Sequence, residues 1–324
     1  MSDLISVVMS TYNTEKEYLN AAIESVLNQN YKNIEFIIIC DGSEEEYKYI
    51  KKKYKDERIK LILHKKNLGL PKSLNEGIKL SKGKYIARMD SDDICLSKRF
   101  QIQKKYMDNN PKIEICGMYA KCIGESNKKC KFYFKKPSEI EIQVLYIPLL
   151  IHPTVMFRKC VFEKNLFYNE EFKCSQDYEL WSRSVNNENT AIIPKIGIYY
   201  RIHKSQAGQK KKQIQLEYTR QIHNKNALKI CNNTNFNDVQ WCLGVLYGFN
   251  SIDKTNYTHF SNIIDEIINN SDMYNKKILK KILYNRYTIL IIKNRLLFKA
   301  CNIKNFNKFL NFTNLKFLFW YIFE

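Results

Sequence analysis

A near-continuous apolar run from Ile34 to Cys40 most constrains what this chain can fold into. Consecutive apolar side chains on a strand point to opposite faces of its sheet, so both faces must be covered by other elements. Similar runs alternate along residues 1–90 with segments whose apolar residues repeat at helical spacing, such as Leu19 to Leu27. This alternation predicts an α/β fold with a parallel sheet and right-handed crossovers.

The length and charge of the chain indicate two regions. Its 324 residues suffice for one large domain or two modest ones. We expect a catalytic domain over 1–205, with halves 1–110 and 111–205, followed by a mainly helical basic region over 206–324. Residues 205–324 hold 18 Lys and Arg against 7 Asp and Glu, and the net charge of the chain is +20. A basic, aromatic-rich segment suits nucleic acid or an anionic membrane surface.

Cysteine usage and hydropathy bear on the compartment. Ten cysteines occur without a Cys-x-x-Cys pair, so neither a zinc site nor a redox pair is indicated. No signal peptide precedes the first strand, and Lys and Arg interrupt every apolar run before the roughly 18 residues that a membrane span needs. We therefore expect a cytoplasmic protein. Its basic region either contacts the cytoplasmic face of the inner membrane peripherally or only caps the catalytic core.

Polar residues follow three of the expected strands, at Ser10 to Asn13, at Asp41 and at Asp90 to Asp93. The carboxyl ends of parallel strands meet at one edge of a sheet, so these groups should line one cleft. Three carboxylates within four residues repel one another unless a cation lies among them, which favours a divalent metal site. The alternatives are a solvated acidic turn that caps the next helix and a phosphatase-type Asp nucleophile.

A nucleotide is the natural occupant of such a cleft. No Gly-x-Gly-x-x-Gly follows the first strand, and no Gly-x-x-x-x-Gly-Lys loop is present. A dinucleotide dehydrogenase and a P-loop phosphotransferase are therefore disfavoured. A metal, rather than a glycine-rich helix start, would have to hold the phosphates.

Four ordered motifs in residues 5–110 together resemble the nucleotide-binding half of the family 2 glycosyltransferases, which have the GT-A fold, a Rossmann-like and mostly parallel sheet with flanking helices. The motifs are Ser6 to Asn13, Asp41-Gly42-Ser43, Asn67-Leu68-Gly69 and Gly83 to Asp93. The resemblance implies a metal-dependent, inverting hexosyl- or N-acetylhexosaminyltransferase. It would move a single sugar from a nucleotide-sugar, expected to be a UDP-sugar, to a saccharide or lipid-linked acceptor in bacterial lipopolysaccharide or capsule synthesis. Processive relatives carry Gln-x-x-Arg-Trp, which is absent here.

The same resemblance implies the donor site. Asp41 would accept from the uracil N3–H, and Asp92 would be the direct ligand of Mn²⁺ or Mg²⁺, with His203 completing the metal shell. Cys40 stands where the family commonly has a second Asp. The implied donor-binding residues are Thr11, Tyr12, Asn13, Asp41, Asn67, Arg88, Asp90 and Ser91.

Residues Ser175 to Arg183 resemble the family's Glu-Asp-x-x-Leu-Trp-x-Arg segment, which implies that Asp177 is the catalytic base. Leu180 and Trp181 are expected to face the core, leaving Asp177 and Tyr178 near the cleft entrance. The simpler interpretation is that Asp177 only caps its helix. The implied acceptor-binding residues are His152, Tyr178 and Trp181, although His152 could equally be a strand-end histidine with a structural hydrogen bond.

Two other functions are weighed against this hypothesis. A nucleic-acid-binding protein would explain the basic region, but carboxylates at the strand ends would repel phosphate, so no nucleic-acid partner is expected. A nucleotidyltransferase acting on sugar phosphates usually has a Gly- and Arg/Lys-rich loop after the first strand, where this chain has Ser10 to Asn13. Residues Ser205 to Gln209 are expected to form a loop that closes over the donor.

Overall fold

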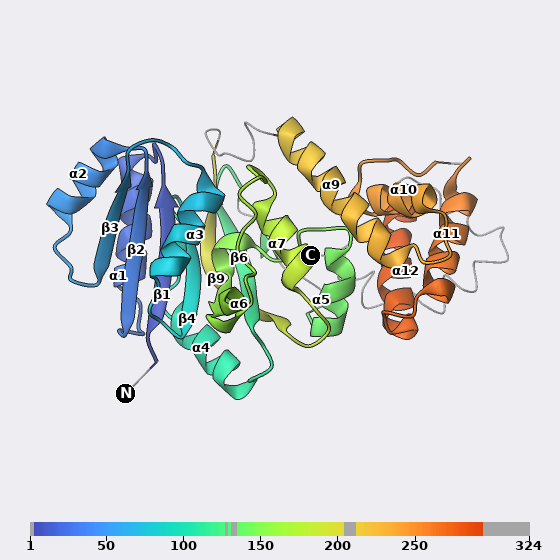
Figure 1. The fold of residues 1–324 in the computed structure, drawn as a ribbon, viewed down its shortest axis with the longest axis horizontal. Coiled ribbons are helices and arrows are strands. Elements are labelled where there is room, and N and C mark those ends of the chain that lie inside the picture. The colour runs from blue at the N-terminus through green and yellow to red at the C-terminus, as the bar shows by residue number, and fades with distance from the viewer. Residues whose placement is uncertain (1–2, 127–128, 131–134, 204–211, 254, 294–324) are drawn as a thin grey trace. The chain divides into compact units, whose positions relative to one another are not determined.

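The computed structural model describes residues 3–126, 129–130, 135–203, 212–253 and 255–293. The chain divides into two compact units. The first comprises Met1–Pro137 and Pro148–Tyr218, and the second comprises Ser138–Ile147 and Thr219–Glu324. The sheet belongs to the first unit, and the described part of the second unit is helical (Figure 1).

The first four strands form the parallel half of the sheet. They are β1 (Ile5–Thr11), β2 (Ile34–Asp41), β3 (Ile59–His64) and β4 (Tyr85–Asp90), in the order β3-β2-β1-β4. Their register aligns the carboxyl ends, because Ser10 of β1 pairs with Asp90 of β4 and Asp41 pairs with His64. The prediction of a parallel α/β sheet is confirmed, and the polar residues expected at strand ends lie along one edge of it.

The second half of the sheet contains antiparallel strands. β8 runs antiparallel to both β4 and β6, while β9 runs parallel to β6 and antiparallel to β5. The bounds are β5 (Ile94–Cys95), β6 (Ile115–Gly124), β7 (Lys129–Cys130), β8 (Met156–Arg158) and β9 (Thr190–Ile202). β7 pairs antiparallel with β6. A 3₁₀ turn, η1 (His152–Thr154), precedes β8, so His152 lies in this turn and not at the end of a strand.

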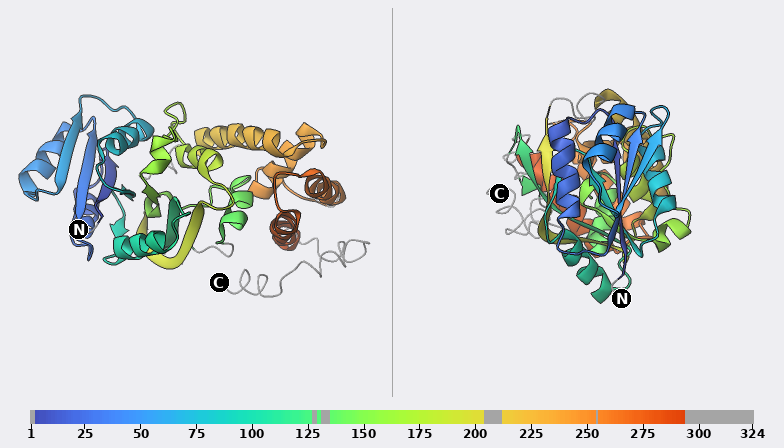
Figure 2. Two further views of the ribbon diagram at one scale, coloured as in Figure 1. Left: turned by 60° about the horizontal axis from the view of Figure 1, so that its bottom comes forward. Right: turned by 90° about the vertical axis from the view of Figure 1, so that its left-hand side faces the viewer.

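Helices cover both faces of the parallel strands. One face packs against α1 (Lys16–Leu27), α2 (Glu44–Lys53) and α4 (Arg99–Asn109) in a single buried cluster. The other face packs against α3 (Leu70–Leu80), which approaches so closely that a Cβ on Gly77 would lie 2.5 Å from Val8. Figure 2 shows these strands and helices from two further directions. Covering both faces is what the continuous apolar strands require.

The second unit is an assembly of helices. It holds α10 (Phe236–Tyr247), α11 (Tyr257–Asn270), α12 (Lys276–Lys293) and most of α9 (Lys212–Ile230). It also takes in α5 (Pro137–Val144) from its second residue on, and Lys281 of α12 forms an ion pair of 2.8 Å with Glu139 of α5. Among the described residues, no helix is long and apolar enough to cross a membrane. The helical character expected of the C-terminal region is confirmed.

Some expectations concern parts of the chain that the structure does not describe. The expected boundary at residue 205 and the loop Ser205 to Gln209 lie within residues 204–211, outside the described ranges. The aromatic end of the chain lies within 294–324 and is likewise outside them. The domain ranges 1–205 and 206–324 therefore stay a prediction. The sequence carried no signal that residues 138–147 would group with the second unit.

Candidate active site

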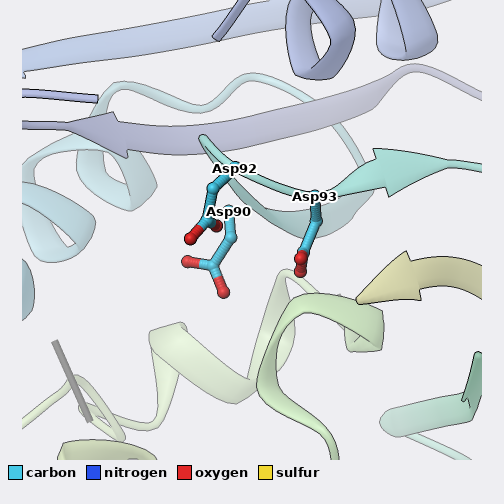
Figure 3. A group of neighbouring side chains, drawn as sticks. All are labelled: Asp90, Asp92 and Asp93. Atoms are coloured by element: carbon cyan, nitrogen blue, oxygen red, sulfur yellow. The ribbon is translucent and has the colours of Figure 1, made fainter. Parts of the chain in front are cut away.

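An acidic turn follows β4 at the carboxyl edge of the sheet. One carboxylate oxygen from each of Asp90, Asp92 and Asp93 lies within 4.8 Å of the other two, and the close view shows the three side chains gathered in one place (Figure 3). Asp90 and Asp92 are partly exposed, whereas Asp93 is fully buried. Oxygen-rich clusters of this kind are the sites that Mg²⁺ and related hard cations prefer.

Burial and mutual repulsion act on the titration of this turn. Burial raises the pKa of Asp92, and the negative charge of Asp90 raises it further, against the opposing effect of His203. Burial likewise raises the pKa of Asp93 well above its usual range, with Asp90 and Asp92 adding to the shift. The Oδ2 atom of Asp93 has no hydrogen-bond partner among the described residues. These are the electrostatic conditions that a bound cation would relieve.

Residues at the end of β9 and directly after it contact the acidic turn. Arg201 donates from its backbone nitrogen to Asp93 Oδ1 and from Nε to the Asp92 carbonyl, both at 2.8 Å. Its guanidinium carbon lies 4.1 Å from the centre of the Tyr18 ring of α1. His203 Nε2 lies 2.9 Å from Asp92 Oδ2. The structure thus brings together the two residues that the sequence analysis assigned to the metal.

Asp41, at the end of β2, organises the loop between β3 and α3. Its Oδ1 accepts from the Leu68 backbone nitrogen at 2.8 Å, and its Oδ2 accepts from the Gly69 nitrogen at 2.9 Å. His64 Nδ1 also lies 2.8 Å from Oδ1. Asn67, which the sequence analysis assigned to the donor, lies exposed in this loop.

The end of β1 presents two of its predicted site residues and buries a third. Tyr12 is 52% exposed, and Asn13, with φ of 54°, is exposed as well. Thr11 is 1% exposed, and its hydroxyl donates to Glu46 Oε1 at 3.1 Å. Contact of Thr11 with the donor, as the sequence analysis implies it, stays a prediction; in the structure its hydroxyl faces Glu46.

A hydroxyl chain joins this loop to the acidic turn. Glu46 Oε1, in the first turn of α2, accepts from the Thr14 backbone nitrogen at 2.6 Å. The Thr14 hydroxyl lies 3.0 Å from the Thr11 hydroxyl and 2.8 Å from the Ser91 hydroxyl. Ser91 was predicted to bind donor, and the structure places it next to the loop that would hold the base.

Asp177 lies in the first turn of α7 (Gln176–Ser184) and is partly exposed. Its Oδ1 accepts from the Tyr178 nitrogen at 2.8 Å, and the positive end of the helix dipole favours a carboxylate here. Burial nevertheless raises the pKa of Asp177, with the charge of Arg88 opposing the shift and that of Asp90 adding to it. Arg88, only 4% exposed, is itself paired with Asp90. Asp177 is therefore an electrostatic neighbour of the acidic turn.

The three predicted acceptor residues lie in the core. Trp181 is fully buried and stacks on Phe157 with 5.8 Å between ring centroids, and Tyr178 is 1% exposed. His152 Nε2 lies 2.7 Å from the Tyr168 hydroxyl, and burial lowers the pKa of His152 well below its usual range, so the ring is neutral. Direct contact of these three side chains with the acceptor therefore stays a prediction. In the structure they pack in the core around α7.

Replacement of Trp181 by Phe tests whether the Trp181 side chain stabilises the core. We expect Trp181→Phe to lower the free energy of unfolding by about 1–3 kcal/mol, because it leaves a void in a filled core. Denaturant unfolding followed by circular dichroism measures the loss. Trp241→Phe is the matched control, since Trp241 is only partly buried and should cost less. Equal stability of Trp181→Phe and the unaltered protein would contradict the core assignment.

Comparison with known proteins places the chain in a family. The fold is a mixed sheet with helices on both faces of its parallel strands and a carboxylate cluster at the end of its fourth strand. The profile of Glycosyl transferase family 2 matches residues 6–166. An uncharacterized glycosyltransferase of Methanocaldococcus jannaschii is 37% identical over 259 residues, covering 76% of this chain and 88% of that protein. The chain belongs to glycosyl transferase family 2 and is a glycosyltransferase.

Two further similarities extend the comparison. The O-antigen biosynthesis glycosyltransferase WbnJ of Escherichia coli is 35% identical over 210 residues, covering 62% of this chain and 80% of WbnJ. Residues 1–349 of TarS from S. aureus, whose crystal structure contains UDP-GlcNAc, align with a TM-score of 0.61. That alignment covers 90% of this chain and 88% of TarS 1–349 at 16% identity, so it bears on the fold alone.

Several site residues escaped the sequence analysis. Glu46, His64, Tyr168 and Arg201 all contact predicted site residues, yet none was singled out for the part it plays here. Glu46 is one of three consecutive glutamates, and only its burial distinguishes it. His64 carried the best available signal, since it is a polar residue at the end of an apolar strand.

Proposed function

We propose that the protein transfers a single sugar from a UDP-sugar to a saccharide or lipid-linked saccharide acceptor in cell-surface polysaccharide synthesis, with inversion and with a divalent metal. The observation that carries the proposal is the cluster of Asp90, Asp92 and Asp93 carboxylates at the carboxyl end of β4, with His203 Nε2 2.9 Å from Asp92 Oδ2. The UDP-GlcNAc bound to TarS and the O-antigen role in the name of WbnJ support the donor and pathway classes.

The donor's base would lie at the ends of β1 and β2. Tyr12 offers an exposed ring on which a base can stack, and Asp41 offers a carboxylate oxygen as acceptor for an N–H. Asn13 follows Tyr12 in the chain, and Asn67 directly precedes the Leu68 and Gly69 nitrogens that bond to Asp41; both are exposed and would supply amide groups for the ribose or base. Asp90 lies next to Ser10 along the same edge of the sheet, and Ser91 follows it within the acidic turn.

The acidic turn suits a divalent metal. The partly exposed Asp90 and Asp92 would hold Mn²⁺ or Mg²⁺ with His203, while buried Asp93 anchors β9 through Arg201. When bound, the cation would neutralise charge on the departing nucleoside diphosphate. Arg88 forms an ion pair with Asp90, which keeps that carboxylate in place.

Asp177 is assigned the role of general base. It would remove the proton of the acceptor hydroxyl, whose oxygen then attacks the anomeric carbon on the side opposite the leaving diphosphate. Burial raises the pKa of Asp177, which brings its proton affinity closer to the operating pH and makes the carboxylate a more effective base. The hydrogen bond from the Tyr178 nitrogen fixes one oxygen and leaves the other for the acceptor.

The test is a screen of nucleotide sugars with Mn²⁺, Mg²⁺ or EDTA, read as released nucleoside diphosphate. We expect release from a UDP-sugar with metal and none in EDTA. Proton NMR of the product should show the anomeric configuration opposite to that of the donor. Salt-dependent binding of random DNA with no turnover of any nucleotide sugar would instead favour a nucleic-acid-binding function.

Peripheral contact with anionic lipid belongs to this proposal. Residues 205–324 hold 18 Lys and Arg against 7 Asp and Glu, which supports such contact. Each Lys or Arg near an anionic leaflet contributes about 1 kcal/mol to the binding free energy. Flotation with phosphatidylglycerol vesicles, but not with phosphatidylcholine vesicles, is the expected result. Absence of flotation with both would leave the second unit as a cap on the enzyme.

Thr14 tests the link between the base and the acidic turn. We expect Thr14→Val to raise the KM for donor about 2- to 10-fold, the effect of losing a hydrogen bond worth about 0.5–1.5 kcal/mol. The change removes the hydroxyl that bridges Thr11 and Ser91 but keeps the branched shape. Steady-state kinetics against donor concentration measures it. Thr14→Ser keeps the hydroxyl and should behave as the unaltered enzyme; a rise as large in Thr14→Ser would contradict the assignment.

A further inference from the structure

His64 ends β3 and lies between two carboxylates from different elements. Its Nδ1 is 2.8 Å from Asp41 Oδ1 of β2, and its Nε2 is 2.8 Å from Glu76 Oε2 of α3. The His64 and Asp41 side chains are 6% and 3% exposed, whereas that of Glu76 is 41% exposed. A buried imidazole is thus held from both ends.

The number of protons needed for the two hydrogen bonds of His64 selects one charge state of its ring. Ionised carboxylates only accept hydrogen bonds, and a neutral imidazole carries one N–H. Only the imidazolium form donates to Asp41 and Glu76 at once. Burial by itself lowers the pKa of His64, but the hydrogen bonds to Asp41 and Glu76 outweigh it and raise the pKa above its ordinary value. Asp41 and Glu76 are the charged groups facing the ring, and the lysines that follow at Lys65 and Lys66 are exposed.

The acceptor count of Asp41 shows what His64 controls. A carboxylate offers about four acceptor positions, two on each oxygen. Oδ1 uses both of its positions, one for His64 and one for the Leu68 nitrogen. Oδ2 uses one for the Gly69 nitrogen. No further donor to Asp41 is present among the described residues, so one position on Oδ2 remains for a ligand, and the three protein donors fix the orientation of the group.

We propose that His64 is a positioning residue for the donor: clamped between Asp41 and Glu76, its imidazolium holds the Asp41 carboxylate so that one Oδ2 position stays available to the N–H of a pyrimidine base. The inference rests on the proposed function, because it takes Asp41 as the group that meets the base. His64 does not touch the donor, and its effect passes through Asp41.

The proposal makes donor affinity depend on pH in a stated direction. Below the pKa of His64 both carboxylates receive a proton. As the pH rises through that pKa, the ring keeps one N–H, and either Asp41 or Glu76 faces a nitrogen lone pair. Either Asp41 then loses one of its hydrogen-bond donors, or the hydrogen bond between His64 and Glu76 is lost. The affinity for the nucleotide should therefore fall as the pH rises.

The experiment combines histidine NMR with binding of UDP in the presence of Mg²⁺, using the full chain. The chain has five histidines, and His64→Gln identifies the His64 signal by its loss. We expect His64 to titrate above the ordinary value of about 6.5 and UDP affinity to fall over the same pH range. In His64→Gln, affinity below that range should drop by about 10-fold or more, as for loss of a hydrogen bond to a charged group, and this part of the pH dependence should vanish.

Glu76→Gln separates positioning from simple structural support. The change removes one of the two charges that stabilise the imidazolium, so the His64 titration and the fall in UDP affinity should both move to lower pH by the same amount. His259→Gln is the matched control, because His259 is ion-paired with Asp238 in the second unit and should leave UDP affinity unchanged.

The outcomes distinguish this inference from the proposed function. UDP binding whose pH dependence is the same in the unaltered protein, His64→Gln and Glu76→Gln would overturn the role of His64 alone. A His64 that titrates at or below 6.5 would also overturn it. Failure of the unaltered protein to bind UDP at any pH would overturn the proposed function, and the positioning role with it.

Discussion

Replacement of Asp177 by Asn is expected to lower turnover about 10²–10⁴-fold, the usual contribution of a positioned general base. The amide keeps the shape of the side chain and can still accept the hydrogen bond from the Tyr178 nitrogen. It cannot take up the acceptor's proton. Because the base is assigned no part in holding the nucleotide, the affinity for UDP should stay within about 2-fold of the unaltered enzyme. Steady-state kinetics and UDP titration measure the two quantities.

Stability supplies a second readout for the same variant. Burial raises the pKa of Asp177, which means that the fold disfavours its charged form at neutral pH. Asn carries no charge, so Asp177→Asn should unfold at the same temperature as the unaltered protein or at a higher one. A purely capping role predicts the reverse, namely lost stability with retained turnover. Asp238→Asn is the matched control, since Asp238 also lies in the first turn of a helix, α10, but belongs to the second unit.

The first half of the fold could be predicted because its signals are local. The helical spacing of Leu19 to Leu27 is observed as α1 (Lys16–Leu27), and α3 (Leu70–Leu80) begins with Pro71 in its first turn. The continuous apolar run at Ile34 is observed as a strand buried on both faces. In each case the chain's own periodicity, together with glycine and proline, sets the element and its ends.

The second half depends on long-range pairing, which one sequence does not display. β9 was missed because Pro194 interrupts its apolar pattern, and its register against β6 shifts between Met118 and Tyr119 and again between Tyr119 and Ala120. The end of this strand reaches the acidic turn, where Arg201 forms hydrogen bonds with Asp92 and Asp93. The resemblance to the family placed His203, which follows this strand, at the metal, but the pattern of residues 190–202 does not predict the strand that carries it there.

The motifs identified positions in the site but not how each side chain is used. Asp41 and Thr11 both stand at strand ends, and both were predicted to meet the donor. The structure turns the Thr11 hydroxyl toward Glu46 and leaves Asp41 with one unused acceptor position. The difference arises from partners 23 to 35 residues away in the chain, His64 and Glu46, whose approach only the packed fold determines.

The acidic turn gives the other large expected effect. Asp92→Asn should weaken binding of Mn²⁺ by more than about 100-fold, because even residues that only support a metal ligand cost about 10- to 100-fold. Asn can keep a hydrogen bond to His203 but removes a negative charge from the cluster. Isothermal titration with Mn²⁺ measures the affinity, and turnover should fall with it at a fixed metal concentration.

A thermal assay tests the same site without any substrate. A ligand at 100 times its dissociation constant stabilises the fold by about 2.7 kcal/mol, so Mn²⁺ at that concentration should raise the Tm of the unaltered protein. The same Mn²⁺ concentration should leave the Tm of Asp92→Asn unchanged. Asp56→Asn is the control, since the Asp56 side chain is 27% exposed, pairs with Arg58 and lies outside the acidic turn. If Mn²⁺ stabilised Asp92→Asn as strongly as Asp56→Asn, Asp92 would not be a metal ligand, and the metal would have to be sought elsewhere in the chain.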